Sequence, residues 1–172
     1  VLKLKSGYNI GLEINKIIKI EKNPSIEKNI EKNQEIEKSS DLPNILLLST
    51  GGTIASKIDY RTGAVTPVLT AEELNSSVPE LGKIANIDTK VLFSEYSENI
   101  MPEHWLKIAE TVKEYSKSDY SGIIIAHGTD TMHYTSSYLS FSLAGFPIPI
   151  ALVGSQRSSD RASSDAALNL IG

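Results

Sequence analysis

The sequence predicts an α/β fold in which helices cover both faces of a mostly parallel sheet, giving three layers. One reason is that strand-sized apolar runs alternate with helical patterns along most of the chain, which is typical of parallel sheets. The predicted strands are residues 45–49, 91–93, 123–126 and 148–153, and the predicted helices are residues 102–115, 131–143 and 165–171. A second reason is that two strands end in loops rich in Thr and Gly, and parallel sheets bind ligands at the carboxyl ends of their strands.

Each predicted element has a local cause. The run at 45–49 is continuously apolar and has the length of a buried strand. Pro102 begins a helix whose apolar residues recur at helical spacing. The helix at 131–143 ends before Gly145 and Pro147. Residues 70–73 (Thr-Ala-Glu-Glu) have capping-box spacing, which predicts a short helix toward Leu74. The apolar face expected for the helix at Pro102 consists of Trp105, Ile108, Ala109, Val112 and Tyr115.

Three segments are predicted along the chain. Residues 1–20 alternate apolar and polar side chains around a turn at 6–9, as a hairpin from the C-terminal part of a small β-barrel module would. Residues 21–43 repeat Ile-Glu-Lys-Asn and carry too few large apolar groups to offset the entropy of ordering, which favours a charged linker over a helix. Residues 44–172 form the α/β domain. The chain opens without Met and stops at Gly172 directly after a helical pattern, so we expect the protein to continue at both ends.

Composition excludes several kinds of chemistry. The 172 residues contain no cysteine, which rules out disulfides, thiolate metal ligands and a cysteine nucleophile. His104, His127 and His133 form no ligand cluster by spacing, so no metal site is predicted. Apolar runs are too short to span a bilayer and no secretory signal opens the chain, so we expect a cytoplasmic protein with no membrane contact.

Charge is unevenly distributed along the chain. The first 43 residues carry eight Lys and seven acidic residues, whereas the remainder carries nine Lys/Arg and 14 acidic residues within a net charge of −4. An acidic domain is poorly suited to binding a phosphate backbone. If nucleic acid is involved, we therefore expect a partner to hold it.

The first candidate site is residues 50–53, Thr-Gly-Gly-Thr, where a buried strand ends. A hydroxyl held beside glycines with free backbone N–H groups could act as a nucleophile next to an oxyanion site. The same pattern also fits a tight turn in which Thr50 only caps the loop. A nucleotide-binding loop is disfavoured because no Gly-Lys-Ser/Thr follows.

The second candidate site is residues 127–131, His-Gly-Thr-Asp-Thr, at the end of a later strand. Thr129 and Asp130 pair a hydroxyl with a carboxylate, which could bind an ammonium group or organise proton transfer. The alternative is a strand-to-helix junction in which Thr129 or Asp130 caps the helix.

Taken in order, four motifs resemble the type I (bacterial-type) L-asparaginase family over residues 44–172. They are residues 50–56, 97–99 and 127–132, and then 153–157 followed by Ser164-Asp165 and Asn169-Leu170. The resemblance implies that this segment is the N-terminal domain of that family's fold. It also implies a smaller second domain that is absent from these 172 residues.

The resemblance also implies roles for individual residues. Thr50 matches the nucleophile that attacks the side-chain amide of glutamine or asparagine and releases ammonia. Thr129 and Asp130 match the second threonine and the aspartate of the catalytic group, and Tyr60 is similar to the tyrosine of the family's lid. The family's catalytic lysine has no counterpart in this sequence, so we expect these 172 residues to be inactive by themselves.

Substrate-binding roles follow in the same way. Ser97 matches the serine that holds the α-carboxylate of the substrate, although its residue type alone favours a solvated loop hydroxyl. Glu98 stands where the family usually has glutamine, and we expect it to face the α-ammonium group. Gly51, Gly128 and the loop amides near Thr129 are the expected contacts to the acyl oxygen and substrate.

Within the family, residues 5–11, 59–65, 97–99 and 155–160 are similar to a subfamily of archaeal tRNA-dependent amidotransferase subunits. That likeness implies glutamine hydrolysis that supplies ammonia to a partner, the amidotransferase's E-type subunit, which uses ATP and Mg to convert Glu-tRNA(Gln) to Gln-tRNA(Gln). This chain would then need no cofactor, would meet tRNA mainly through the partner and would self-associate through its asparaginase-like domain. The alternatives are a stand-alone asparaginase or glutaminase and a non-enzymatic amino-acid-binding domain.

Overall fold

A computed structural model describes residues 2–3, 9–10, 14–16, 38–58, 65–67, 78–157 and 164–172. Its centre is a four-stranded sheet in the order β6-β3-β7-β8, in which every neighbouring pair is parallel. The parallel sheet that the sequence predicts is therefore confirmed. Its strands are β3 (Asn44–Gly51), β6 (Asn86–Glu95), β7 (Gly122–Ala126) and β8 (Ile150–Val153).

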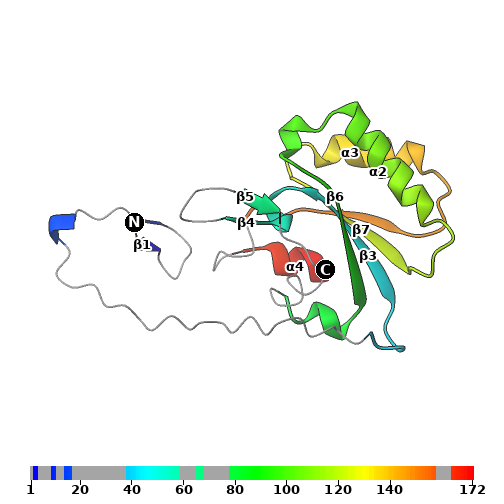
Figure 1. The fold of residues 1–172 in the computed structure, drawn as a ribbon, viewed down its shortest axis with the longest axis horizontal. Helices are drawn as coiled ribbons and strands as arrows, with labels where there is room; N and C mark the ends of the chain where they lie inside the picture. The colour runs from blue at the N-terminus through cyan, green and yellow to red at the C-terminus, as the bar shows by residue number, and fades with distance from the viewer. Residues whose placement is uncertain are drawn as a thin grey trace.

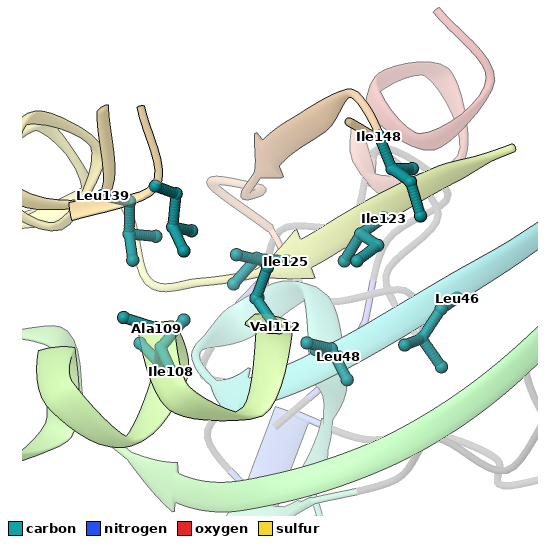
Figure 2. Close-up of a cluster of buried hydrophobic side chains, with 10 residues drawn as sticks. Leu46, Leu48, Ile108, Ala109, Val112, Ile123, Ile125, Leu139 and Ile148 are labelled. Carbon is teal, nitrogen blue, oxygen red and sulfur yellow. The ribbon is translucent and has the colours of Figure 1, made fainter. Parts of the chain in front are cut away.

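Helices cover both faces of this sheet, as Figure 1 shows. Helices α2 (Pro102–Glu114) and α3 (Met132–Ser142) lie on one face and α4 (Ala166–Ile171) on the other. Side chains alternate along a strand, so Leu46 and Leu48 of β3 pack on the α2/α3 side while Leu47 packs on the α4 side. The α2/α3 cluster appears in Figure 2 and comprises Leu46, Leu48, Ile108, Ala109, Val112, Ile123, Ile125, Leu139, Leu143 and Ile148. Three layers are thus confirmed.

Shorter elements lie around the sheet. β4 (Ser56–Ile58) pairs antiparallel with β5 (Val65–Pro67), and 3-10 turns occur at η2 (Thr53–Ala55), η3 (Leu81–Lys83) and η4 (Ser97–Asn99). Near the amino terminus, β1 (Leu2–Lys3) pairs antiparallel with β2 (Asn9–Ile10), and η1 (Ile14–Lys16) follows. The predicted alternation therefore does not continue as a strand through Ile14.

Some predictions concern residues that the structure does not describe. The helix expected at 70–74 and most of the charged linker, residues 21–37, lie outside the described ranges. The boundaries of the three predicted segments therefore stay predictions.

Two strands differ in length from the prediction. β6 begins at Asn86, whereas the sequence predicted only residues 91–93. The missed part is Asn-Ile-Asp-Thr-Lys, which has no continuous apolar run. Among the strands that the structure describes, β6 pairs only with β3 and so lies at the edge of this sheet, where polar residues are tolerated. β8 begins at Ile150 rather than at 148, since Pro149 has no N–H to donate to a ladder.

The segment before β3 is fastened to the amino end of β6. The Asn86 side chain donates to the carbonyl oxygens of Ser39 (2.8 Å) and Leu42 (3.2 Å). Asp88 accepts hydrogen bonds from Lys38 Nζ at 2.7 Å and from the Tyr120 hydroxyl at 2.9 Å. Burial raises the pKa of Asp88, but the bonds from Lys38 and Tyr120 and the lysine charge outweigh it, so the net pKa lies below its ordinary 3.8. This attachment lies at the opposite end of the strands from the loops described next.

The strand order creates a switch point between β3 and β7. The chain passes from β3 to β6 on one side, and from β7 to β8 on the other. In open α/β sheets such a reversal leaves a crevice at the carboxyl ends of the two strands. In the part of the chain that the structure describes, no helix is long and apolar enough to cross a membrane.

Candidate active site

Loops that follow the four parallel strands meet at one edge of the sheet. β3 ends at Thr50 and Gly51, and β6 leads into η4, which begins at Ser97. Residues 127–130 follow β7, and residues 154–157 follow β8. The four asparaginase-like motifs all begin at this edge, because the carboxyl ends of parallel strands lie together.

The Thr50 hydroxyl lies at the switch point. Its side chain is 1% exposed, and Oγ1 donates a 2.9 Å hydrogen bond to the carbonyl oxygen of Ala126, the last residue of β7. Pairing with β6 is irregular here, since Ser49 faces Val91 but Gly51 faces Glu95. Such irregularities are frequent beside functional sites. The bond to Ala126 positions the hydroxyl, but a carbonyl oxygen is too weak a base to remove its proton.

Glycines allow the loops to approach one another at backbone distances. Gly51 and Gly52 have φ of +110° and +78°, as the sequence suggests for a Gly-Gly turn. A Cβ on Gly51 would lie 2.4 Å from the Glu95 carbonyl oxygen, and one on Gly52 would lie 2.5 Å from the Gly128 nitrogen. A Cβ on Gly128 would lie 2.7 Å from that of Ser97. The glycines therefore bring the β3, β6 and β7 loops into direct contact.

Ser97 is a buried part of this edge, so the interpretation of its hydroxyl as a solvated loop group is wrong. Its side chain is 4% exposed, and Oγ lies 3.5 Å from Oδ2 of Asp130. The Thr131 hydroxyl donates a 2.7 Å bond to the Ser97 carbonyl oxygen and ties η4 to the start of α3. A hydroxyl donor beside a carboxylate can bind a group that carries both an anion and an ammonium. Glu98, the next residue of η4, is exposed.

The structure brings most of the predicted site residues together. The Gly51–Gly52 turn lies against Glu95 and Gly128, and Ser97 lies against Gly128 and Asp130. Thr129 is half-buried. A Cβ on Gly154 would lie 2.9 Å from Thr129 Cγ2, so Thr129 packs against the β8 loop. Tyr60 falls between β4 and β5 but outside the described residues. Among the residues that are described, no three His, Cys, Asp or Glu side chains are grouped to hold a metal.

Sequence reasoning missed a buried hydrogen-bond chain behind the β7 loop. Trp105 Nε1 donates to Thr135 Oγ1 at 3.0 Å, and Thr135 Oγ1 lies 2.9 Å from His127 Nε2. His127 Nδ1 lies 2.7 Å from the Gly128 carbonyl oxygen. Burial lowers the pKa of His127 below its ordinary 6.5, and the Gly128 bond only partly offsets this, so the ring is neutral at neutral pH. The one sequence signal was a histidine placed directly after a buried strand.

A second missed feature is a carboxylate that holds the β8 loop. Asp165 accepts from the backbone N–H groups of Gln156 and Arg157, both at 3.0 Å. The Asn169 side chain donates to Asp165 at 3.1 Å and to the Gly154 carbonyl oxygen at 2.9 Å. The Gln156 bond is the main cause that holds the pKa of Asp165 below its ordinary 3.8; burial opposes it, and the other bonds add to it. The resemblance motif at 153–157 and the one at 164–170 are therefore a single packed unit.

Known proteins are similar to this chain in sequence and in fold. Residues 44–172 match a family model described as asparaginase, N-terminal. Curated relatives named as the D subunit of glutamyl-tRNA(Gln) amidotransferase include one from Pyrococcus horikoshii (52% identical) and one from Methanococcus maripaludis (53%). Each alignment covers 99% of this chain, which spans 40% and 41% of the length of those two relatives.

A solved structure is also similar. It is titled as the thermostable L-asparaginase from Thermococcus kodakarensis, is 39% identical and superposes with a TM-score of 0.66. The match covers 74% of this chain and 38% of that one. Since the family model spans most of its residues, the chain belongs to the asparaginase family, with residues 44–172 corresponding to the family's N-terminal domain.

Proposed function

We propose that this chain provides the nucleophile and part of the amide-binding site of the glutaminase component of a tRNA-dependent amidotransferase. The observation that carries the proposal is the buried Thr50 hydroxyl at the β3/β7 switch point, with the Ser97–Asp130 contact on the same edge. The names of the curated relatives support the amidotransferase assignment, and the asparaginase family supports amide hydrolysis.

The reaction is nucleophilic acyl transfer. Thr50 Oγ1 attacks the side-chain amide carbon of glutamine, and the carbon–nitrogen bond breaks once the leaving nitrogen is protonated, so that ammonia departs. The resulting glutamyl ester is hydrolysed by water, which yields glutamate and restores the Thr50 hydroxyl. Backbone N–H groups near Gly51 and Thr129 stabilise the negative charge on the amide oxygen.

The remaining residues bind and orient the amino-acid part of glutamine. Ser97 donates to the α-carboxylate, while Asp130 and the exposed Glu98 attract the α-ammonium. The Thr129 hydroxyl assists proton transfer beside the nucleophile. The family resemblance also assigns Tyr60 to this site, as the tyrosine of the family's lid.

The proton of Thr50 needs a stronger base than the Ala126 carbonyl that it contacts. We propose that the base is the family's lysine, supplied from outside these 172 residues. These residues alone are then inactive, and the complete protein is required for turnover.

Ammonia passes to the partner, the E-type subunit of the amidotransferase, which binds ATP, Mg and Glu-tRNA(Gln) and forms Gln-tRNA(Gln). The net charge of −4 supports this division of labour, because an acidic chain binds a phosphate backbone poorly. The complex is cytoplasmic, where tRNA is charged, and the asparaginase-like domain also self-associates.

Thr50→Ala in the complete protein, assayed for ammonia release with partner and Glu-tRNA(Gln), tests the nucleophile. We expect activity to fall by about a thousand-fold or more, while glutamine still raises the melting temperature. Thr50→Ser is the matched control and keeps measurable turnover because it keeps a hydroxyl. Full activity in Thr50→Ala would contradict the proposal. Glutamine-induced stabilisation without ammonia release, in wild type as in Thr50→Ala, would favour a non-enzymatic amino-acid-binding domain.

A second candidate is a stand-alone asparaginase or glutaminase, which is favoured by the similarity to the structure titled as an L-asparaginase. The two functions differ in partner dependence. Glutamine hydrolysis that rises only with the E-type partner and Glu-tRNA(Gln) supports the amidotransferase. Rapid asparagine hydrolysis by the complete protein without a partner supports the second candidate.

A further inference from the structure

The hydrogen bonds that link Trp105, Thr135 and His127 can be assigned a single donor-to-acceptor order. His127 Nδ1 faces a carbonyl oxygen, which can only accept, so Nδ1 carries the ring proton. In the neutral ring Nε2 is then an acceptor, and the Thr135 hydroxyl must donate to it. The Thr135 oxygen in turn accepts from the Trp105 indole N–H, which can only donate. Every donor in the chain therefore has its acceptor.

This chain fixes the orientation of one peptide in the site. The His127 ring is 0% exposed and is bonded to Thr135 of α3, so it lies toward the α2/α3 layer. The Gly128 carbonyl points at that ring. Since the described peptide bonds are trans, the N–H of the same peptide, on Thr129, points the opposite way. Within the described part of the chain, the Thr129 N–H has no acceptor.

The Gly128 Cα, at which this peptide begins, lies beside the nucleophile's loop. A Cβ on Gly52 would lie 2.5 Å from the Gly128 nitrogen and 2.7 Å from its Cα, so the turn that follows Thr50 rests on this backbone. Rotation of the Gly128–Thr129 peptide by half a turn would present a carbonyl oxygen to the acyl oxygen of the substrate. Repulsion would then replace a hydrogen bond in the transition state.

We propose that His127, Thr135 and Trp105 are positioning residues that hold the Gly128–Thr129 peptide with its N–H toward the amide substrate. This inference rests on the proposed function, because the N–H acts on the charge that develops during amide hydrolysis. The side-chain hydrogen bonds of the three residues join them to one another and to the Gly128 carbonyl oxygen, whereas the Thr50 hydroxyl bonds to Ala126. Their effect reaches the reaction through one peptide, and so falls on kcat more than on KM.

Thr135→Val in the complete protein, with its partner and tRNA, is the main test. Valine keeps the shape of threonine and removes the hydroxyl, so His127 Nε2 and the Trp105 N–H lose their bonds. We expect kcat to fall about ten- to a hundred-fold with KM within about three-fold, since loss of a whole oxyanion donor costs about a hundred- to a thousand-fold. Thr135→Ser should restore kcat, and Ser140→Ala, on the exposed side of α3, should leave it unchanged. Equal kcat in wild type, Thr135→Val and Thr135→Ser would overturn the proposal. A Thr135→Val variant that melts at a lower temperature but keeps the wild-type kcat would overturn it as well.

Nuclear magnetic resonance of protein labelled with ¹⁵N at histidine and threonine separates this inference from the proposed function. We expect the Nδ1–H tautomer of His127 in wild type, and a shift of the Thr129 amide signal in Thr135→Val but not in Ser140→Ala. An Nε2–H tautomer or an unmoved Thr129 signal would overturn the inference even if the enzyme is active. If wild type and Thr50→Ala hydrolyse glutamine equally, the proposed function fails, and the resonances alone decide whether the chain orients the peptide.

Discussion

Gly51 and Gly145 both have a positive φ angle, but glycine is required at the two positions for different reasons. The φ angles are +110° and +78° respectively. Around Gly145 nothing lies within 4 Å of where a Cβ would be, whereas at Gly51 the Glu95 carbonyl oxygen lies 2.4 Å from that point. Gly145 therefore needs only conformational freedom, while Gly51 also needs the empty space that lets β3 and β6 close beside Thr50.

Alanine at these two positions separates the two effects. We expect Gly145→Ala to lower the free energy of unfolding by about 1–2 kcal/mol, the cost of a left-handed backbone. We expect Gly51→Ala to lose this amount and about 1–3 kcal/mol more from overpacking, because a strand backbone cannot move aside as a side chain can. Denaturant unfolding of the complete protein measures both. Equal losses would mean that the close approach to Glu95 contributes nothing.

The Tyr120 hydroxyl gives a prediction for alkaline pH. Burial, and then the hydrogen bond to Asp88 and its charge, raise the pKa of Tyr120 from 10.0 to about 12. The folded state favours the protonated phenol, so its contribution to stability is complete below pH 10 and is lost as the pH rises from 10 toward 12. We expect Tyr120→Phe to flatten the decline in unfolding free energy over this range. The control is Tyr96→Phe, since Tyr96 is 57% exposed. If the unfolding free energy of Tyr120→Phe declined with pH in parallel with wild type, Tyr120 would not be the group responsible.

At the scale of elements, the site depends on short segments that hold one another. The four strands supply rigid ends, but the loops beyond them are fixed by side chains from elsewhere: Thr131 holds η4, and Asp165 holds the β8 loop. Lys107 of α2 donates to the Leu92 carbonyl oxygen at 3.1 Å, within the stretch of β6 where the register shifts opposite Thr50. Helices thus define loop geometry as well as covering the sheet.

Asp165→Ala tests the attachment of the β8 loop. Hydrogen bonds to a charged group are worth about 1.5–3 kcal/mol, so we expect the amides of Gln156 and Arg157 to exchange at least about ten-fold faster. Hydrogen exchange read by mass spectrometry on the complete protein measures this. Asp119→Ala is the control, because that exposed carboxylate bonds to Asn44 rather than to this loop. Unchanged exchange in Asp165→Ala would show that packing alone holds the segment.

At the scale of the molecule, two cores on opposite faces of the sheet set the stability of the α/β domain. The larger one joins β3 and β7 to α2 and α3, and Figure 2 shows Val112 of α2 near Leu48 and Ile125. The smaller one contains Leu47, Ala126, Ala166 and Leu170 and covers the α4 face. Both cores place residues on β3 and β7, so the strands that present the candidate nucleophile are also the best packed.

Two aliphatic residues of α2 provide a matched comparison. Ile108 is 0% exposed and Leu106 is 52% exposed. We expect Ile108→Ala to lower the free energy of unfolding by about 2–5 kcal/mol through lost burial and a cavity. Leu106→Ala should stay within about 0.5 kcal/mol of wild type, as surface substitutions usually do. Similar losses at the two positions would show that Leu106 is covered in the complete protein.

Much of this fold could be predicted from local patterns. The helical spacing from Trp105 to Tyr115 predicts α2 and its buried face, and the run at 123–126 predicts β7 almost to the residue. β6 was underestimated because the polar residues at its start, such as Asp88, carry no apolar run. Thr50 and Ser97 could be proposed from motifs, but the burial of Ser97 could not, since a short polar loop looks solvated in any local window.

Local sequence patterns were enough to predict the alternation of strands and helices, the sheet edge where the candidate site residues gather, the hydroxyl at the end of β3 and the likeness to the asparaginase family. They did not establish which groups meet at that edge, and the three-dimensional packing supplies this. Thr50 bonds to Ala126 across 76 residues, and Trp105 bonds to Thr135 across 30. The reason is physical: periodicity reports which face of an element is buried, whereas hydrogen-bond partners depend on how separate elements pack, and that is not written in any local stretch of sequence.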